Sequence, residues 1–326
     1  MTPIGVLVMA YGGPDKLEDV PEYLRGVRGG RPAGPEILEE LIERYRQIGG
    51  RSPILERTRA QAAALERTLN SNTGRHGSDG RFRAYVGMRH WHPTIGKTLA
   101  RMEQDGVERA VGLVMAPHYS RMSVGAYYKR IEDARSTIEI AAIERWHLCP
   151  GYLEAVVERI RAALGRFPEQ DRGQVPVLFT AHSLPERILR CGDPYRDELQ
   201  ETVRALTGRL EGPERTSKGG GRGGGGERYH FAFQSAAMTP EPWLGPDAGE
   251  IIARLASEGK RHVLIVPIGF VCEHVEILYD VDVEFRKQAA ARGMQLERIE
   301  MLNDAPALVE GLAVMVRKEA GEKNWL

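Results

Sequence analysis

Eight short apolar runs, rich in β-branched residues, alternate with stretches of helical periodicity, and this alternation limits the possible folds more than any other feature. The helical stretches include 35–48, 55–70, 151–165 and 246–258. Strands that alternate with helices predict parallel sheets whose two faces are both covered by helices. The predicted strands are 5–10, 83–88, 109–116, 138–145, 176–181, 229–234, 262–270 and 296–301.

The eight predicted strands divide into two sets of four, because Pro150 and Gly151 interrupt the chain near its middle. A chain of 326 residues is long enough for two domains with real cores. The two halves carry the same order of elements. We therefore predict an α/β fold with two similar Rossmann-like domains, each a four-stranded parallel sheet flanked by helices, at 1–150 and 151–304. A last helix within 305–326 would pack on either domain.

Composition excludes several classes of function. Lys plus Arg equals Asp plus Glu at 45 each, so no net field attracts nucleic acid or an acidic membrane surface. The longest apolar run has about nine residues, against the roughly 20 that cross a bilayer. The N-terminus lacks the pattern of a secretion signal. Cys149, Cys191 and Cys272 are too few and too far apart for a disulfide framework or a cysteine metal cluster. We expect a cytoplasmic monomer.

One low-complexity segment, SKGGGRGGGG at 217–226, is predicted to be a flexible surface loop. A phosphate-binding loop is the alternative interpretation. Such loops follow a strand and open a helix, whereas this segment precedes a predicted strand.

Polar side chains gather just after the predicted strands. Ligands of doubly wound sheets bind beyond the carboxyl ends of the strands, so these side chains are candidates for a site in a cleft that both halves share. Five of the nine histidines belong to the set. Its members are Tyr11, Arg89, His90, His92, His118, Tyr119, Ser120, His182, Ser183, Gln234, Ser235, Glu273 and His274.

Four acidic residues follow the seventh predicted strand at spacings of three, four and four: Glu273, Glu276, Asp280 and Glu284. On an α-helix they would share an arc of roughly 80°. Like charges four residues apart repel by roughly 0.2–0.5 kcal/mol per pair in an isolated helix. The stripe therefore indicates either a solvated acidic face or a place that handles a metal ion or protons.

His182 ends the fifth predicted strand. A neutral imidazole on a rigid strand end can bind a metal or accept a proton. The alternative is a structural histidine beside a helix start, because Ser183 and Glu186 have capping-box spacing. An imidazole and a carboxylate without a thiolate suit a divalent metal held transiently.

The N-terminal region offers donors for an anionic ligand. Arginine binds carboxylates in bidentate fashion, although surface arginines on helices are the commoner explanation of such a cluster. The turn after Tyr11 lacks the GxGxxG pattern of a dinucleotide site. The donors are Arg28, Arg44, Tyr45, Arg46 and Ser52.

Six segments resemble the ferrochelatase family, in the order in which that family carries them. The HSLP and HVEILYD stretches are the most specific. The resemblance implies two similar domains around a cleft, with ferrous iron as a substrate and no permanently bound cofactor. The segments are VLVMAYGGP, YRQIGGRSPI, APHYSRMSVGAYYKR, FTAHSLPERI, FQSAAMTPEPWLGPD and VPIGFVCEHVEILYDVDVEF.

The resemblance also implies roles for individual residues. His182 and Glu276 match the catalytic and metal-binding residues of the family, and Asp280 and Glu284 match an accessory acidic path. Gly29, Arg89 and Glu273 stand where relatives often carry Arg, Lys and Asp. The positions that match porphyrin contacts are Tyr11, Arg28, Arg44, Tyr45, Ser52 and Tyr127.

Within the family, the chain is similar to the Gram-positive type that converts coproporphyrin III, with its four propionates, into coproheme. Tyr11, the WLGPD run at 243–247 and the segment 23–55, rich in Arg and Glu, are typical of that type. Protoporphyrin is the alternative substrate. Two competing hypotheses are a cobalt chelatase and a non-catalytic haem or metal carrier. The resemblance further implies transient contact with downstream enzymes of haem synthesis.

Overall fold

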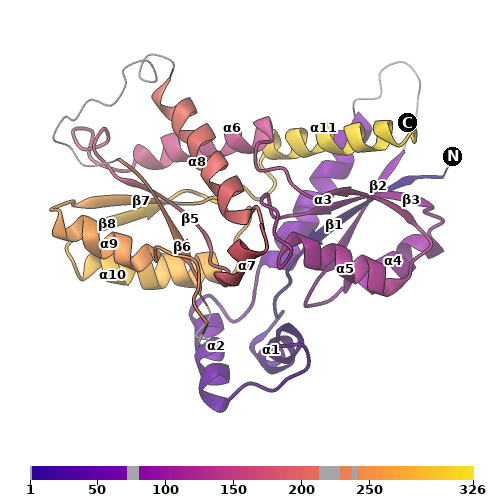
Figure 1. Ribbon diagram of the computed structural model, residues 1–326, viewed down its shortest axis with the longest axis horizontal. Coiled ribbons are helices and arrows are strands. Elements are labelled where there is room, and N and C mark those ends of the chain that lie inside the picture. Colours follow the sequence, from indigo (N-terminus) through magenta and orange to yellow (C-terminus); the bar gives the residue numbers. More distant parts are fainter. Residues whose placement is uncertain (1, 72–80, 213–227, 237–240) are drawn as a thin grey trace. The chain divides into compact units, whose positions relative to one another are not determined.

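The computed structural model describes residues 2–71, 81–212, 228–236 and 241–326, so the glycine-rich loop at 217–226 lies outside the described residues. The chain forms two compact units (Figure 1). The first contains Met1–Gly151, Val271–Val275 and Asn303–Leu326, and the second contains Tyr152–Phe270 and Glu276–Leu302. The short segment Val271–Val275 therefore belongs to the first unit, although it lies within the second half of the sequence.

The first unit is built on a parallel sheet with the strand order β2-β1-β3-β4. Helix α3 packs on β1 and β2, and α11 packs on α3 and β4. A separate hydrophobic cluster joins the strands to α4 and α5. The strands are β1 (Ile4–Ala10), β2 (Phe82–Met88), β3 (Arg109–Val114) and β4 (Glu139–Ile143), and the helices are α3 (Ile54–Ser71), α4 (Ile95–Gln104), α5 (Val124–Ala134) and α11 (Pro306–Glu322).

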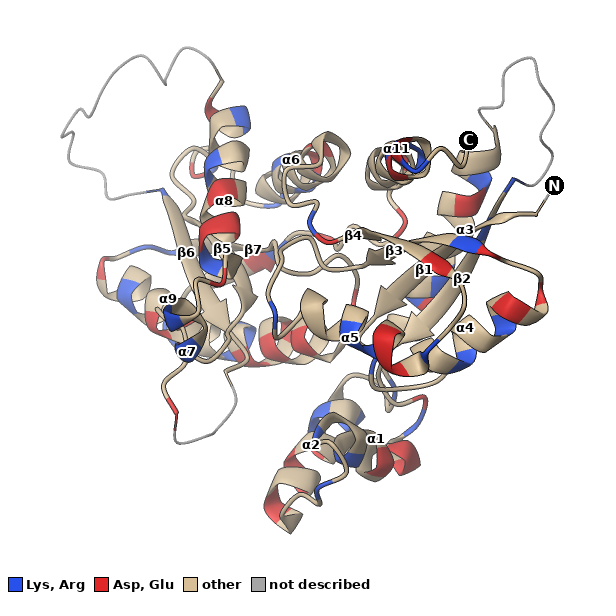
Figure 2. Cartoon of the chain, turned by 45° about the vertical axis from the view of Figure 1, so that its right-hand side comes forward, with Lys and Arg blue, Asp and Glu red and all other residues tan. Residues whose placement is uncertain are grey.

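Two further helices of the first unit, α1 (Val20–Val27) and α2 (Pro35–Gln47), follow a short 3₁₀ turn, η1 (Leu17–Asp19). Their apolar faces form a cluster around Tyr23 and Tyr45, which meet edge to face with ring centroids 6.3 Å apart. We call α1, α2 and this cluster the lip. Both helices carry exposed charged residues of both signs (Figure 2), which agrees with the Arg- and Glu-rich composition of this segment.

The second unit repeats the strand order of the first, as β6-β5-β7-β8, and all its strands are parallel. The repeated order confirms the prediction of two similar four-stranded α/β units. The strands are β5 (Val177–His182), β6 (Tyr229–Gln234), β7 (His262–Pro267) and β8 (Gln295–Arg298), and the helices are α6 (Pro150–Leu164), α7 (Arg187–Arg190), α8 (Tyr195–Glu211), α9 (Ala248–Ser257), η2 (Glu276–Phe285) and α10 (Arg286–Ala290).

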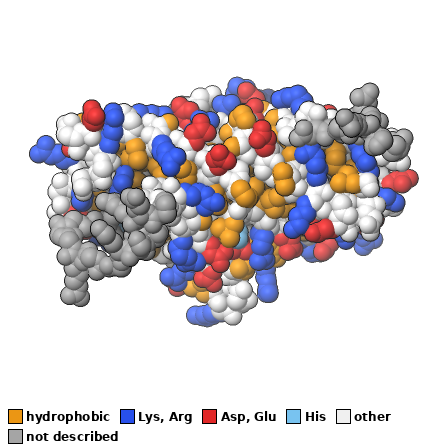
Figure 3. Space-filling view, turned by 90° about the horizontal axis from the view of Figure 1, so that it is seen from above, with side chains coloured by type: hydrophobic (Ala, Val, Ile, Leu, Met, Phe, Trp, Pro, Cys, Tyr) orange, Lys and Arg blue, Asp and Glu red, His pale blue; other side chains and the backbone are white. Residues whose placement is uncertain are grey.

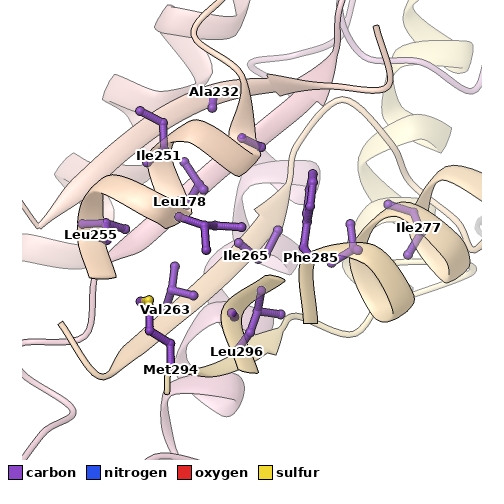
Figure 4. Close-up of a cluster of buried hydrophobic side chains, with 14 of the residues drawn as sticks. Leu178, Ala232, Ile251, Leu255, Val263, Ile265, Ile277, Phe285, Met294 and Leu296 are labelled. Carbon is purple, nitrogen blue, oxygen red and sulfur yellow. The ribbon is translucent and has the colours of Figure 1, made fainter. Parts of the chain in front are cut away.

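The core of the second unit includes strand side chains such as Leu178, Val263 and Ile265. Ile277 and Phe285 of η2 belong to the same cluster (Figure 4). Burying an aliphatic or aromatic side chain contributes roughly 1.5–3 kcal/mol, so these contacts hold η2 firmly against the sheet. The positions of η2 that do not face this core can carry polar side chains.

The predicted strands are all present, but four are shorter than expected. The third ends at Val114 and the fourth spans Glu139–Ile143. The seventh ends at Pro267 and the eighth at Arg298, because the chain turns away from the ladder after each. No helix among the described residues is both long and apolar enough to cross a membrane. Charged side chains of both signs lie across the face shown in Figure 3, which agrees with the zero formal net charge.

Candidate active site

His182 is the last residue of β5, a strand whose earlier side chains are all buried. Its ring Nδ1 lies 2.9 Å from Oε2 of Glu276, and its side chain is 34% exposed. The hydroxyl of Tyr195, the first residue of α8, donates to the carbonyl of His182 across 2.9 Å. The ladder and this hydrogen bond fix the backbone of His182. Because Nδ1 faces Glu276, a ligand would meet the imidazole at Nε2.

Two opposing effects act on the His182 ring. Burial alone would lower the pKa of His182, but the carboxylate of Glu276 and the hydrogen bond to it, together with the charge of Asp280, raise the pKa above its ordinary value. The imidazole is therefore a better proton acceptor than an exposed histidine. The predicted capping box beside it is wrong: the hydroxyl of Ser183 donates to the carbonyl of Leu244 instead, across 2.8 Å.

Glu276 opens η2, which is a π-helix of ten residues. Hydrogen bonds in a π-helix reach from residue i to i+5, so its turn is wider than the 3.6 residues of an α-helix. The arc of roughly 80° assumes an α-helix, and the structure shows that this assumption is wrong. Residues four apart still stay on one side in the wider turn, so Glu276, Asp280 and Glu284 share a face while Ile277 and Phe285 face the core.

The acidic face of η2 is partly compensated by neighbouring donors. The hydroxyl of Ser235 donates to Oδ2 of Asp280, which is 8% exposed, and the hydroxyl of Tyr279 donates to Oε1 of Glu284 across 3.1 Å. These neutral donors reduce the repulsion between the carboxylates without cancelling their charge. The face can therefore still attract a cation.

Glu273 is not part of this face. It lies in Val271–Val275, before η2 begins, and its Oε2 is 3.2 Å from Nε of Arg57 on α3. The pair is an ion pair rather than an aligned hydrogen bond, because both atoms lack a hydrogen-bond partner of good geometry. The sequence groups Glu273 with the stripe because its partner Arg57 is remote in sequence.

Tyr11 follows β1 directly and is 38% exposed. Gly12 has φ +96°, and a Cβ there would lie 2.7 Å from Cβ of Trp91, so only glycine fits the turn. A Cβ on Gly13 would lie 2.5 Å from Cβ of Ser52. Ser52 is thus buried against this turn, and its backbone N–H donates to the carbonyl of Pro14 across 2.9 Å.

A cluster of rings and one cation surrounds Tyr11. Its ring centroid lies 4.6 Å from that of His90, and the guanidinium carbon of Arg89 lies 5.9 Å from the Tyr11 ring and 5.4 Å from the Tyr127 ring. Burial, with help from the charges of Arg89 and Arg130, lowers the pKa of His90 to about 4. His90 is therefore neutral at physiological pH.

The remaining predicted porphyrin contacts lie in or next to the lip. Arg28 follows α1 and is exposed, and Arg44 on α2 forms an ion pair with Glu40 at 2.6 Å. Tyr45 is 1% exposed, and its ring forms part of the apolar cluster. The structure thus gives Arg28 and Arg44 accessible guanidinium groups, while Tyr45 contributes mainly packing.

Three contacts around His182 and η2 had no role in the sequence analysis. They are made by Tyr195, by Gln234, whose Nε2 donates to the carbonyl of Glu276 across 3.0 Å, and by Ser235. The positions of Gln234 and Ser235 after a strand were noted, but their partners are distant in sequence. Among the described residues, no three His, Cys, Asp or Glu side chains form a metal-binding group.

Comparison with known proteins identifies the family. The ferrochelatase family model matches residues 3–320. A ferrochelatase from Herpetosiphon aurantiacus is 41% identical over 315 residues, 95% of this chain and 97% of the relative. A coproporphyrin III ferrochelatase from Oceanobacillus iheyensis is 38% identical over 320 residues, 97% of each chain. The structure of SirB from Bacillus subtilis with Fe3+ has a TM-score of 0.53 at 10% identity, covers 99% of this chain and 98% of its own, and supports the fold alone. The chain belongs to the ferrochelatase family.

Proposed function

We propose that the protein inserts ferrous iron into coproporphyrin III, which forms Fe-coproporphyrin III and releases the two pyrrole protons. The observation that carries this proposal is the contact between His182 and Glu276, because one pair supplies both a proton acceptor and a metal ligand. Membership of the ferrochelatase family supports iron insertion, and relatives named coproporphyrin III ferrochelatase support the finer choice of substrate.

His182 would act on the protons of the porphyrin. When a pyrrole N–H gives up its proton, the imidazole receives it, and the carboxylate of Glu276 stabilises the imidazolium that forms. Imidazole and carboxylate are also suitable ligands for Fe2+. A metal binds only the neutral imidazole, so iron and the proton compete for the same ring.

Asp280 and Glu284 would extend the site along η2. Carboxylates at intervals of one turn offer successive positions at which a cation or a proton can be held and passed on. Because Asp280 is buried, water screens its charge only weakly, so the carboxylate attracts a nearby cation more strongly than an exposed one would. We propose that these two residues form the path for Fe2+ toward Glu276, or for protons away from His182.

The porphyrin would be held by Tyr11, Arg28 and Arg44, with the buried side chains of Ser52, Tyr127 and Tyr45 as support. Guanidinium groups bind carboxylates in bidentate fashion, so Arg28 and Arg44 suit the propionates of the substrate. Arg44 would exchange its exposed pair with Glu40 for a propionate at little cost, since such pairs are worth about 0–1 kcal/mol. Binding energy at the rim could then be used to bend the ring and expose its nitrogens.

Coproporphyrin III is favoured over protoporphyrin because arginines, among them Arg28 and Arg44, lie in or next to the lip (Figure 2). Four propionates match arginines better than an apolar rim does. The relatives with 41% identity bear the general name ferrochelatase, and those at 36–38% identity bear the coproporphyrin name.

The deciding experiment incubates the purified protein without oxygen with Fe2+ and either porphyrin, and follows the porphyrin absorption bands. We expect conversion of coproporphyrin III at a kcat/KM at least tenfold above that for protoporphyrin IX. Preference for protoporphyrin would refute the finer proposal. A band shift without metallated product would indicate a carrier instead of an enzyme.

A matched variant tests the assigned chemistry. His182→Ala should abolish iron insertion while coproporphyrin III still binds, because no propionate contact is assigned to His182. Near-normal turnover of this variant would remove His182 from the mechanism.

A further inference from the structure

Two consecutive residues at the end of β6 contact the acidic face of η2. Gln234 is the register partner of His182 in the ladder between β5 and β6, and its Nε2 donates to the carbonyl of Glu276 across 3.0 Å. The hydroxyl of Ser235 donates to Oδ2 of Asp280. One dipeptide therefore holds the start of η2 and a carboxylate one turn further along.

The backbone of Ser235 has an uncommon conformation. Its φ is +60°, in the left-handed region that glycine, asparagine and aspartate tolerate better than other residues. Strain of this kind persists only where other contacts hold it, and it concentrates at functional sites. Glycine would relieve the strain at Ser235 but would lack the hydroxyl that Asp280 accepts from.

The surroundings of this contact are largely closed to water. Gln234 is 1% exposed and Asp280 is 8% exposed. A buried carboxylate loses its hydration, and it also lies four residues from Glu276 on the same helix face. The Ser235 hydroxyl donates to Oδ2 of Asp280 and thereby helps to fix the direction in which this carboxylate points.

We infer that Ser235 is a positioning residue that holds the Asp280 carboxylate in line with Glu276 for metal delivery. The inference rests on the proposed function and adds to it the residue that orients the acidic path. Gln234 supports the same arrangement from the adjacent position, since it fixes the backbone at which η2 begins. Ser235 acts through Asp280, and no contact with the reacting atoms is assigned to it.

Two variants separate the hydroxyl from the backbone strain. Ser235→Ala and Ser235→Gly both remove the donor, but only glycine relieves the left-handed conformation. We expect both to lose about 10–100-fold in kcat/KM for Fe2+ and in Zn2+ affinity measured by calorimetry, which is typical when the partner of a metal-site ligand is removed. The Tm of Ser235→Gly should exceed that of Ser235→Ala by about 2–4 °C.

Arg135 provides a matched control. It is exposed, has φ +51° and lies at the end of α5, in the first unit. Arg135→Gly should raise the Tm by a similar amount with unchanged iron insertion. Both Ser235 variants lack the hydroxyl, so the inference predicts similar activity for them. If Ser235→Gly, the more stable variant, were also the more active, activity would depend on stability, and a structural role would replace the inference.

The dependence on Asp280 is tested by combining variants. Asp280→Ala and the double variant Ser235→Ala/Asp280→Ala should have the same Zn2+ affinity, because a residue that acts through Asp280 has no effect once Asp280 is gone. Additive losses would overturn the inference, as would wild-type Zn2+ affinity in both Ser235 variants. If the wild type bound Zn2+ but inserted no iron, the proposed function would fail, while the Zn2+ measurements would still decide the role of Ser235.

Discussion

Gly269→Ala should displace His182 through a backbone contact and thereby reduce iron insertion. Gly269 lies just after β7, where a Cβ would come within 2.9 Å of Cβ and 3.1 Å of Cα of Ala181. Ala181 is the residue before His182 on β5, and the Cα atom is part of the backbone. No side-chain rotation can relieve that overlap, so the end of β5 has to move.

The size of the effect follows from these distances. Carbon atoms in comfortable contact are about 3.5–4.0 Å apart, so the strand must shift by about 0.5–1 Å. Overpacking of this degree costs about 1–3 kcal/mol, which corresponds to a Tm lower by about 2–12 °C. A displacement of about 1 Å at a catalytic group can cost about 100-fold in rate. We therefore expect kcat to fall about 10–100-fold in folded protein.

The assay compares kcat per folded molecule, at a temperature well below Tm, with a control of similar stability. Gly5→Ala serves as that control, because its Cβ would meet the side-chain atoms Cε of Met102 at 2.6 Å and Cγ1 of Val107 at 2.9 Å, in the first unit. The third neighbour, Cβ of Ala110 at 3.0 Å, lies on β3 of the same unit, so any shift arises in the first unit and not on β5, and this variant should lose stability and keep kcat. Wild-type kcat in Gly269→Ala would refute the idea that this close approach sets the position of His182.

Three further predictions concern charge. Glu276→Gln should lower the pKa of His182, seen by NMR titration. A pKa that is raised in the folded state stabilises the fold below the unfolded pKa of about 6.5, and this stabilisation is lost as pH rises through the folded pKa. The Tm of this variant should therefore fall further below that of the wild type at pH 5 than at pH 8. The pKa of His90 is lowered to about 4 in the folded protein, so between about pH 6.5 and 4 the unfolded chain takes up a proton that the folded chain does not, and stability falls. In His90→Asn the Tm should therefore decrease less over this pH range. Asp280→Asn combined with Glu284→Gln should slow iron insertion at least several-fold, and unchanged turnover would leave η2 with only a solvated acidic face.

Much of the fold could be predicted because its determinants are local. Apolar runs of strand length and helical periodicity depend on neighbouring residues, so all eight strands and the division into two similar units could be read from the pattern. The polar residues at strand ends followed from the rule that parallel strands place their carboxyl ends along one edge. His182 and Gln234 are register partners for that reason.

The type of helix in η2 could have been suspected from its spacing. The buried side chains Ile277, Val281 and Phe285 recur at strict intervals of four, and the acidic residues at 276, 280 and 284 recur at the same interval. An α-helix normally mixes intervals of three and four, because its turn has 3.6 residues. A strict interval of four favours a wider turn, but this signal is weak in a segment of ten residues.

The sequence by itself determined the two α/β units, the strand ends that carry polar groups and the likeness to one family, because these depend on local patterns and on motifs in order. Only the tertiary structure decided the partners: Arg57 for Glu273, Ser235 for Asp280 and Tyr195 for the His182 backbone. The first two pairs join residues more than 40 positions apart. Tyr195 is closer to His182 in sequence, but helix α7 lies between them, so their contact also depends on how the chain folds back. Such contacts, and the positive φ of Ser235, arise when packing brings distant segments together.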